Sequence, residues 1–267
     1  MSYLVNPYMV TSVAAKYTDV DQLRAYFRMN ESSGDIINQA TSVGSSHSVG
    51  SGADMTNNGA TYGATGILGS GTALSFDGVN DYLDNSSLSI FNFMHDVETT
   101  PISLNVWGTD LGNLYMDNHE ICSDYVYPTP VGVSHQMQVV QEYYYYQIYS
   151  DTSDSHPYSV NSNSGVLTDY DDGELHMLST TFDWTLTDSK NVKFYYDGAL
   201  VKEADKKTYT PVSDNSTAGM HIGSSAAGTN FFWYGVMSEL SLWSRVLSAS
   251  DISDLYNSGD GAVIDGT

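Results

Sequence analysis

Two segments near opposite ends of the chain constrain its fold more than any other feature. The first starts at Ala73 and reads A-L-S-F-D-G-V-N-D-Y-L-D. Leu74 and Phe76 alternate with small or polar residues, which is the period-2 pattern of a half-buried strand. Asp77 and Gly78 then predict a turn, because glycine adopts positive φ without steric cost and aspartate bonds its own backbone. The alternation resumes after this turn, so the segment predicts two strands joined by a tight connection.

The second segment runs from Gly235 to Tyr256 and reads G-V-M-S-E-L-S-L-W-S-R-V-L-S-A-S-D-I-S-D-L-Y. Its first half is strand-like and stops at Ser244, after which the apolar residues recur at helical spacing. Ser248 or Ser250 is placed to cap the helix, and Asp251 lies where the helix macrodipole favours an anion. The segment therefore predicts a long strand followed by one short helix.

Together these segments resemble the opening and closing signatures of laminin-G-like domains in the concanavalin A-like lectin and glucanase superfamily. The resemblance implies an all-β fold, a two-sheet antiparallel β-sandwich or jelly roll, with one short C-terminal helix. Further strands match the same pattern at 102–107, 176–183, 191–201 and 220–225. Residues 38–71 are rich in Gly, Ser, Thr and Asn and predict a long loop with a short strand.

The chain divides into three parts on this interpretation. Residues 1–22 predict an extended N-terminal arm that docks either on its own domain or on another subunit. Residues 23–258 predict the laminin-G-like domain, with a tyrosine-rich insertion around 108–165, and residues 259–267 form a C-terminal tail.

Charge and cysteine content exclude several classes of function. The formal net charge is −23 with only 9 Lys and Arg, so nucleic acid is a poor partner, because phosphate binding depends on clustered cations. No stretch approaches the length of a membrane span, and membrane insertion is not expected. The single cysteine, Cys122, excludes an intrachain disulfide framework and is expected to be a buried thiol.

Catalysis is not expected. A retaining glycosidase needs two carboxylates about 5 Å apart, and the resembling glucanases carry them in a Glu-x-Asp-x-x-Glu motif that this chain lacks. The acidic run at 169–174 has the composition of a turn. The seven histidines show no ligand spacing typical of zinc.

The resemblance also implies a structural calcium ion between the first-strand turn and the start of the last long strand. Ser238 stands where relatives carry an aspartate, which leaves Asn30 and Glu239 as the candidate metal ligands. Losing a carboxylate lowers the ligand charge on which calcium affinity depends. A surface position for Glu239 without a metal is the alternative.

Glycan binding is predicted from aromatic residues that lie beside polar ones. Sugars present flat C–H faces and hydroxyls, so a lectin site pairs an aromatic ring with Asp, Asn or backbone groups. The candidates are Tyr143, Tyr145, Tyr149, Asp183, Trp184 and Trp233. Tyr234 fits a packed position, Trp107 and Trp243 are expected in the core, and a contiguous aromatic surface would equally suit a subunit interface.

These observations favour a non-catalytic surface or adhesion module. The start of the chain lacks the basic region of a signal peptide, so we expect a virion surface protein: a fibre, spike or capsid-decorating subunit. Its expected partners are other virion subunits through residues 1–22, host or environmental glycans, and further copies of itself. The alternatives are a secreted, extracellular or cell-surface polysaccharide-binding module and an atypical glycoside hydrolase.

Overall fold

The structure is a computed structural model. It describes residues 15–94, 100–111, 119–123, 172–183, 185–186, 190–205, 219–225 and 228–267, and the backbone alone for 118, 132–138, 143–149 and 158–161.

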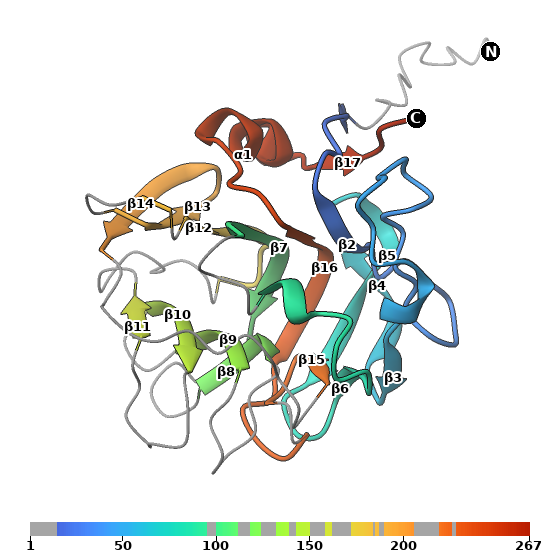
Figure 1. The fold of residues 1–267 in the computed structure, drawn as a ribbon. Helices are drawn as coiled ribbons and strands as arrows, with labels where there is room; N and C mark the ends of the chain where they lie inside the picture. The colour runs from blue at the N-terminus through green and yellow to red at the C-terminus, as the bar shows by residue number, and fades with distance from the viewer. Residues whose placement is uncertain are drawn as a thin grey trace, which may run out of the picture.

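Two antiparallel sheets form the body of the molecule, as predicted (Figure 1). The eight-stranded sheet has the order β14 (Ala199–Ala204), β13 (Val192–Tyr196), β12 (His176–Phe182), β7 (Ile102–Asp110), β16 (Tyr234–Trp243), β5 (Gly69–Asp77) and β4 (Thr61–Gly66), and β2 (Leu23–Phe27) also pairs with β16. The seven-stranded sheet has the order β11 (Tyr158–Asn161), β10 (Tyr143–Tyr149), β9 (Gly132–Gln138), β8 (Asn118–Ser123), β15 (Met220–Ile222), β6 (Tyr82–Asn85) and β3 (Thr56–Asn58). The all-β sandwich with one short helix is thus confirmed.

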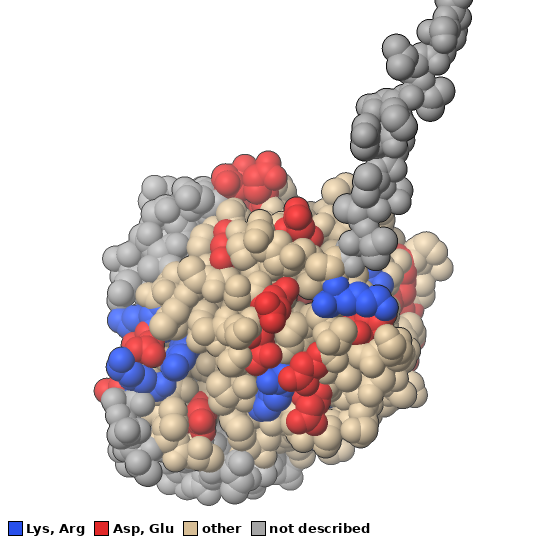
Figure 2. Space-filling view, turned by 90° about the horizontal axis from the view of Figure 1, so that it is seen from above, with Lys and Arg blue, Asp and Glu red and all other residues tan. Residues whose placement is uncertain are grey.

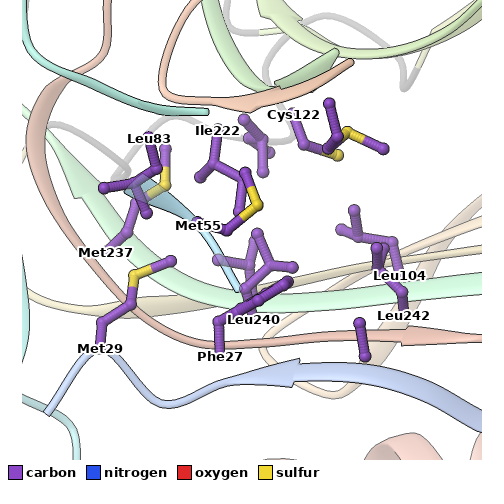
Figure 3. Packing of buried hydrophobic residues seen from close by; sticks show 14 of the residues in the cluster. Phe27, Met29, Met55, Leu83, Leu104, Cys122, Ile222, Met237, Leu240 and Leu242 are labelled. Carbon is purple, nitrogen blue, oxygen red and sulfur yellow. The ribbon is translucent and has the colours of Figure 1, made fainter. Parts of the chain in front are cut away.

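The main core fills the space between these sheets. Phe27, Leu104 and Leu240 from the eight-stranded sheet meet Leu83 and Ile222 from the other, and methionines fill the gaps between them (Figure 3). Cys122 lies in the same cluster, as expected for a buried thiol. Burial of so many apolar side chains supplies most of the driving force for folding.

A third layer covers one end of the outer face of the eight-stranded sheet. It contains α1 (Ala249–Tyr256) and a parallel pair of strands, β1 (Ala15–Tyr17) and β17 (Ala262–Ile264) (Figure 1). Outward-facing Trp107 and Trp243 pack against this layer in a second apolar cluster, so both tryptophans are buried, as predicted. The last part of the predicted arm and the C-terminal tail therefore pair with each other.

The helix begins and ends through identifiable caps. Ser248 Oγ accepts a hydrogen bond from the Asp251 amide at 3.1 Å, and Asp251 Oδ2 accepts one from the Ser248 amide at 2.7 Å. This is a reciprocal capping box. Asn257, in the left-handed conformation, ends α1, and a 3-10 turn (Asn257–Gly259) follows it. Among the described residues, no helix has the length and apolar character needed to cross a bilayer.

Strand β16 changes partners along one edge. Tyr234 to Met237 pair with β5, and Leu240 to Trp243 pair with β2, while β7 lies along the opposite edge. The register shifts between these two parts, and Glu239 at the shift has a φ of 53°. The sheet therefore carries a bulge where one neighbour replaces the other.

One region differs from its prediction. Residues 38–71 contain two 3-residue elements, η1 (Ser51–Ala53) and β3, and then the hairpin β4–β5 in place of a loop with one short strand. Strand β4 is the edge of the sheet, and its residues alternate between exposed and partly buried up to Gly66. An edge strand needs few large apolar residues, so its composition resembles that of a loop.

Candidate functional site

The three predicted tyrosines of β10 occupy positions on the outer face of the seven-stranded sheet. One cross-strand row runs through the core positions: Leu83, Ile222, Cys122, His135, Tyr146 and Val160. The adjacent row contains Asp84, His221, Ser123, Ser134, Gln147 and Ser159. Successive strand positions face opposite sides. Positions 143, 145 and 149 share the face of Gln147, away from the core, and so belong to one surface of the sheet.

A described aromatic group lies on the same outer face, on β6 and β15. The Tyr82 and His221 rings stack with centroids 5.1 Å apart, and Tyr82 also lies near Phe232. Burial lowers the pKa of His221, which keeps its ring neutral near pH 7. Ser123, between this group and β9, is fully buried, so the aromatic group and the β10 positions are separate regions of the face.

Asp183 lies in the connection between β12 and β13. Its Oδ1 accepts hydrogen bonds from the Thr185 amide at 2.9 Å and the Thr185 hydroxyl at 2.6 Å. This is the local turn chemistry typical of aspartate. Trp184, its predicted aromatic partner, lies outside the described residues.

The prediction for Trp233 is wrong. Its side chain is fully buried in the main core, and its ring meets the edge of His119 at a centroid distance of 6.4 Å. The Trp233 amide donates to the Gly223 carbonyl at 2.8 Å, which closes the loop after β15 over the end of the sandwich. A ring held inside the core cannot present its face to a sugar.

The neighbouring residue, Tyr234, was expected to be packed and is instead exposed. It has 42% of its surface accessible, more than any other described aromatic residue. Its backbone is fixed, because its carbonyl accepts from the Leu111 amide at 2.7 Å and it pairs with Asp77 across β5 and β16. A Cβ atom at Gly78 would lie 2.7 Å from the Tyr234 Cβ, so the turn fits closely against this tyrosine.

Glu239 is buried, with 3% of its surface accessible. The Tyr26 hydroxyl donates to Oε2, and Arg28 Nε lies 3.3 Å from Oε1. Burial raises the pKa of Glu239 to about 7, although Arg28 and Tyr26 act in the opposite direction. Burial also raises the pKa of Tyr26, and the neighbouring carboxylate adds to that shift.

Asn30 and Glu239 do not fit a calcium site. Both carboxylate oxygens of Glu239 face donors, and the guanidinium of Arg28 already neutralises its charge. Asn30 is exposed, and its Oδ1 accepts from Gln39 Nε2 at 3.1 Å. Within the described part of the chain, no three His, Cys, Asp or Glu side chains are arranged to hold a metal ion. The predicted surface alternative for Glu239 is also wrong, because its side chain is buried against Tyr26, which belongs to the second apolar cluster.

Sequence reasoning missed a buried pair that joins the two sheets. His119 Nδ1 lies 2.7 Å from Asp110 Oδ2, and both side chains are nearly inaccessible to solvent. Asp110 ends β7 and His119 is the second residue of β8, so the contact links the sheets at the end that Trp233 closes. The only sequence signal was a polar residue at each of two strand ends, which is too common to indicate a contact.

The described cations around α1 are paired. Arg245 lies 3.1 Å from both Asp19 and Asp251, and Lys16 lies 2.6 Å from Asp265. In the view of this end, Lys and Arg atoms adjoin Asp and Glu atoms (Figure 2). Such exposed pairs contribute little stability individually, and among the described residues they leave this end without a concentrated positive patch.

The comparisons with known proteins agree with the fold. A profile of the concanavalin A-like lectin/glucanases superfamily matches residues 114–253. A search of curated protein sequences gave no match.

Several solved structures share the fold. The botulinum neurotoxin serotype D binding domain has a TM-score of 0.59 at 10% identity, over 90% of this chain and 51% of that one. The botulinum neurotoxin type G receptor binding domain has a TM-score of 0.57 at 13% identity, over 88% and 51%. Trypanosoma rangeli sialidase in complex with the inhibitor DANA has a TM-score of 0.55 at 12% identity, over 90% and 34%.

This chain spans between about a third and a half of the length of those structures. At such identities the likeness concerns the fold alone. That fold, two antiparallel sheets with the closing strand and short helix that the sequence signatures predicted, is lectin-like. The chain therefore belongs to the concanavalin A-like lectin and glucanase superfamily, as a laminin-G-like domain.

Proposed function

We propose that this chain is a non-catalytic glycan-binding module that works at a surface. The register of β10 is the single observation that carries the proposal. It places positions 143, 145 and 149 together on the outer face of the seven-stranded sheet, while positions 144 and 146 fall in rows that continue the core. A run of tyrosines at alternate outer positions suits the stacking of sugar rings.

The polar residues around these tyrosines support a carbohydrate ligand. Tyr145 pairs with Gln136 on one side and Asn161 on the other, and Tyr143 pairs with Gln138. Amides offer both donors and acceptors, which suits the hydroxyl groups of a sugar. A site for sulfated or acidic polymers would require Lys or Arg, and none of these positions carries either residue.

The charge of the chain and its first residues support a virion setting for the module. Residues 1–22 include an apolar run that suits docking on another subunit, and the net charge of −23 suits contact with a basic neighbour. We infer a fibre, spike or capsid-decorating subunit at the virion surface. Co-purification with virus particles at a fixed copy number tests this setting, and absence from purified particles would favour a secreted or cell-surface module.

A matched pair of double variants tests the binding face. Tyr143→Ala with Tyr145→Ala is expected to weaken binding on a glycan array while the melting temperature stays nearly unchanged. Tyr144→Ala with Tyr146→Ala is the control from the same strand, and we expect it to lower the melting temperature because these positions follow the core rows. An unaltered binding profile in the first variant would reassign its tyrosines to packing.

The absence of catalysis is tested separately. The protein is expected to release no reducing sugar and no sialic acid from a panel of polysaccharides and sialylated glycans. Turnover of any of these substrates would favour the alternative of an atypical glycoside hydrolase.

A further inference from the structure

We infer that Tyr234 and Asp77 form a second carbohydrate-binding site, specific for uncharged sugars, at the end of the sandwich opposite α1 and the C-terminus. This inference rests on the proposed glycan-binding function, but it concerns a different sheet and residues whose side chains the structure describes.

The side chains on the outer face of β16 become more accessible to solvent from its α1 end toward Tyr234. Near α1, Trp243 and Ser241 are buried beneath the third layer, and Ser238 is still fully buried. Val236 is half-buried, and Tyr234 at the beginning of the strand is exposed. The nine steps of β16 separate Tyr234 from the α1 end by about 30 Å. The C-terminus lies beside α1, and β1, the first described strand, pairs with β17 at the same end (Figure 1), so Tyr234 lies far from the part of the domain that residues 1–22 would tether.

The Tyr234 ring has a carboxylate beside it. Asp77 and Tyr234 are direct cross-strand partners, and such partners share a face with Cβ atoms roughly 5 Å apart. Asp77 Oδ1 accepts hydrogen bonds from the amides of Val79 at 2.8 Å and Asn80 at 3.2 Å. No described group donates to its second oxygen, Oδ2, which is thus available to a sugar hydroxyl. An aromatic ring and an acceptor side by side are the two parts that sugar recognition requires.

The pair is held rigidly. Asp81 Oδ2 accepts from the Asp77 amide at 2.9 Å and closes the turn from inside. The Leu111 amide holds the Tyr234 carbonyl, and Gly78 fits against the Tyr234 side chain where a larger residue would collide with it. A preorganised site loses less conformational entropy on binding, which favours a ligand site over an adaptable surface.

Size and charge identify the ligand. The apolar part of the surface consists of Tyr234 with Val79 and Leu111, which have 68% and 49% of their surfaces accessible. Three side chains are far too few for a stable protein interface, which buries roughly 800 Å² on each partner. Asp77 carries a negative charge, and its neighbours Val79, Asn80 and Leu111 carry no positive charge. Acidic sugars would be repelled, so an uncharged glycan is the ligand that fits.

The test uses the full-length chain with defined probes. Binding is measured by titration calorimetry and ligand-observed NMR against cello-, laminari-, malto- and chito-oligosaccharides as uncharged probes, and sialyllactose and oligogalacturonate as acidic ones. Tyr234→Ala is expected to raise the Kd for the best uncharged probe about tenfold. Tyr234→Phe keeps the ring and should bind nearly as well as the wild type, and Asp77→Asn should weaken binding while keeping the acceptor that the turn needs. Leu200→Ala, at an exposed position on β14, is the control and should bind normally.

The outcomes separate this inference from the proposed function. Loss of binding in the Tyr143→Ala, Tyr145→Ala variant with normal binding in Tyr234→Ala would overturn the second site and leave the proposed function standing. No binding of any probe would overturn both. Binding of acidic probes alone would overturn the assignment to uncharged sugars. A change of sedimentation coefficient in Tyr234→Ala without any effect on sugar binding would assign the surface to contact between copies of the chain instead.

Discussion

Arg28 Nε lies 3.3 Å from Glu239 Oε1 at the bulge where β16 changes its partner from β5 to β2. The Tyr26 hydroxyl donates to the other carboxylate oxygen. The family resemblance implied a bound cation beside this position, and the chain provides a guanidinium there instead. The three side chains thus join the first described strand of the sandwich to its last long strand.

Removing Arg28 is expected to destabilise the protein strongly. Arg28→Met leaves the buried Glu239 carboxylate without its cation, which typically costs about 3–5 kcal/mol of unfolding free energy. Urea unfolding at pH 8 measures this loss. Arg24→Met is the matched control: Arg24 lies on β2, the strand that Arg28 directly follows, 4.9 Å from the Phe93 ring centroid, and its loss should cost roughly 1 kcal/mol. Equal effects of the two variants would show that the Arg28–Glu239 contact is not important for stability.

Stability is expected to fall as the pH rises toward neutrality. The pKa of Glu239 is raised from 4.5 to about 7 in the folded protein, so the folded state binds a proton that the unfolded state has released between these values. Ionising the buried group above pH 7 therefore costs about 3 kcal/mol relative to pH 4.5. Urea unfolding between pH 5 and pH 8 should show this loss in the wild type relative to Glu239→Gln, and parallel curves for the two proteins would contradict it.

The titration of His176 also lowers stability as the pH rises, but its contribution is the same in the wild type and in Glu239→Gln and cancels when the two are compared. Its hydrogen bond with Asp197 at 2.8 Å raises its pKa, with a further contribution from Asp172. A raised pKa stabilises the folded state below the usual value of 6.5, and the effect is lost as the pH rises through the folded value. Both proteins retain His176, so the difference between their curves reports on Glu239.

The periodic parts of the sequence were sufficient to predict the sandwich. Leu74 and Phe76 alternate because one side of β5 faces the core, and the helix after Ser244 follows from its cap and its apolar spacing. The division into residues 1–22, 23–258 and 259–267 stays a prediction. Strand β4 was not predicted, because an edge strand with one solvent-exposed face shows almost no alternation of apolar residues in its sequence.

The site residues were less predictable for a specific reason. In N-F-F-W-Y every position from 231 to 234 is aromatic, so composition cannot decide which ring turns inward. Which of these rings faces inward is set by where β16 begins and by the hydrogen bond from the Trp233 amide to the Gly223 carbonyl, and neither is visible in the sequence. Glu239 was misplaced for a similar reason, since a one-residue change of register at a bulge reverses the face of every residue beyond it.

Gly235 is expected to tolerate no side chain. A Cβ atom there would lie 2.0 Å from the Thr109 carbonyl oxygen, and its φ is 147°. Gly235→Ala would force β7 and β16 apart in the centre of the sheet, at a cost of roughly 3 kcal/mol. Gly63→Ala separates the clash from the backbone strain, because Gly63 also has positive φ but open space around it, and we expect it to cost about 1 kcal/mol. Similar losses in denaturant unfolding would contradict the steric argument.

Calcium is not expected to act through Glu239. The carboxylate is engaged by Arg28 and Tyr26, so any change of melting temperature on adding calcium or EDTA should be the same in the wild type and in Glu239→Gln. Differential scanning calorimetry of both proteins, each treated with EDTA and then with calcium, makes the comparison. A calcium-induced rise confined to the wild type would restore Glu239 as a ligand.

The start of α1 should depend more on Asp251 than on Ser248. Ser248→Ala removes one half of the capping box and should cost about 1 kcal/mol. Asp251 also accepts from the Tyr17 hydroxyl at 2.6 Å and pairs with Arg245 at 3.1 Å, so Asp251→Ala frees β1 from the helix as well as uncapping it. We expect Asp251→Ala to lower the free energy of unfolding by more than Ser248→Ala, and Asp254→Ala, an exposed acid on the same helix, to change it by less than about 0.5 kcal/mol. Equal losses for Ser248→Ala and Asp251→Ala in urea unfolding would show that the contacts of Asp251 with Tyr17 and Arg245 add nothing to the cap.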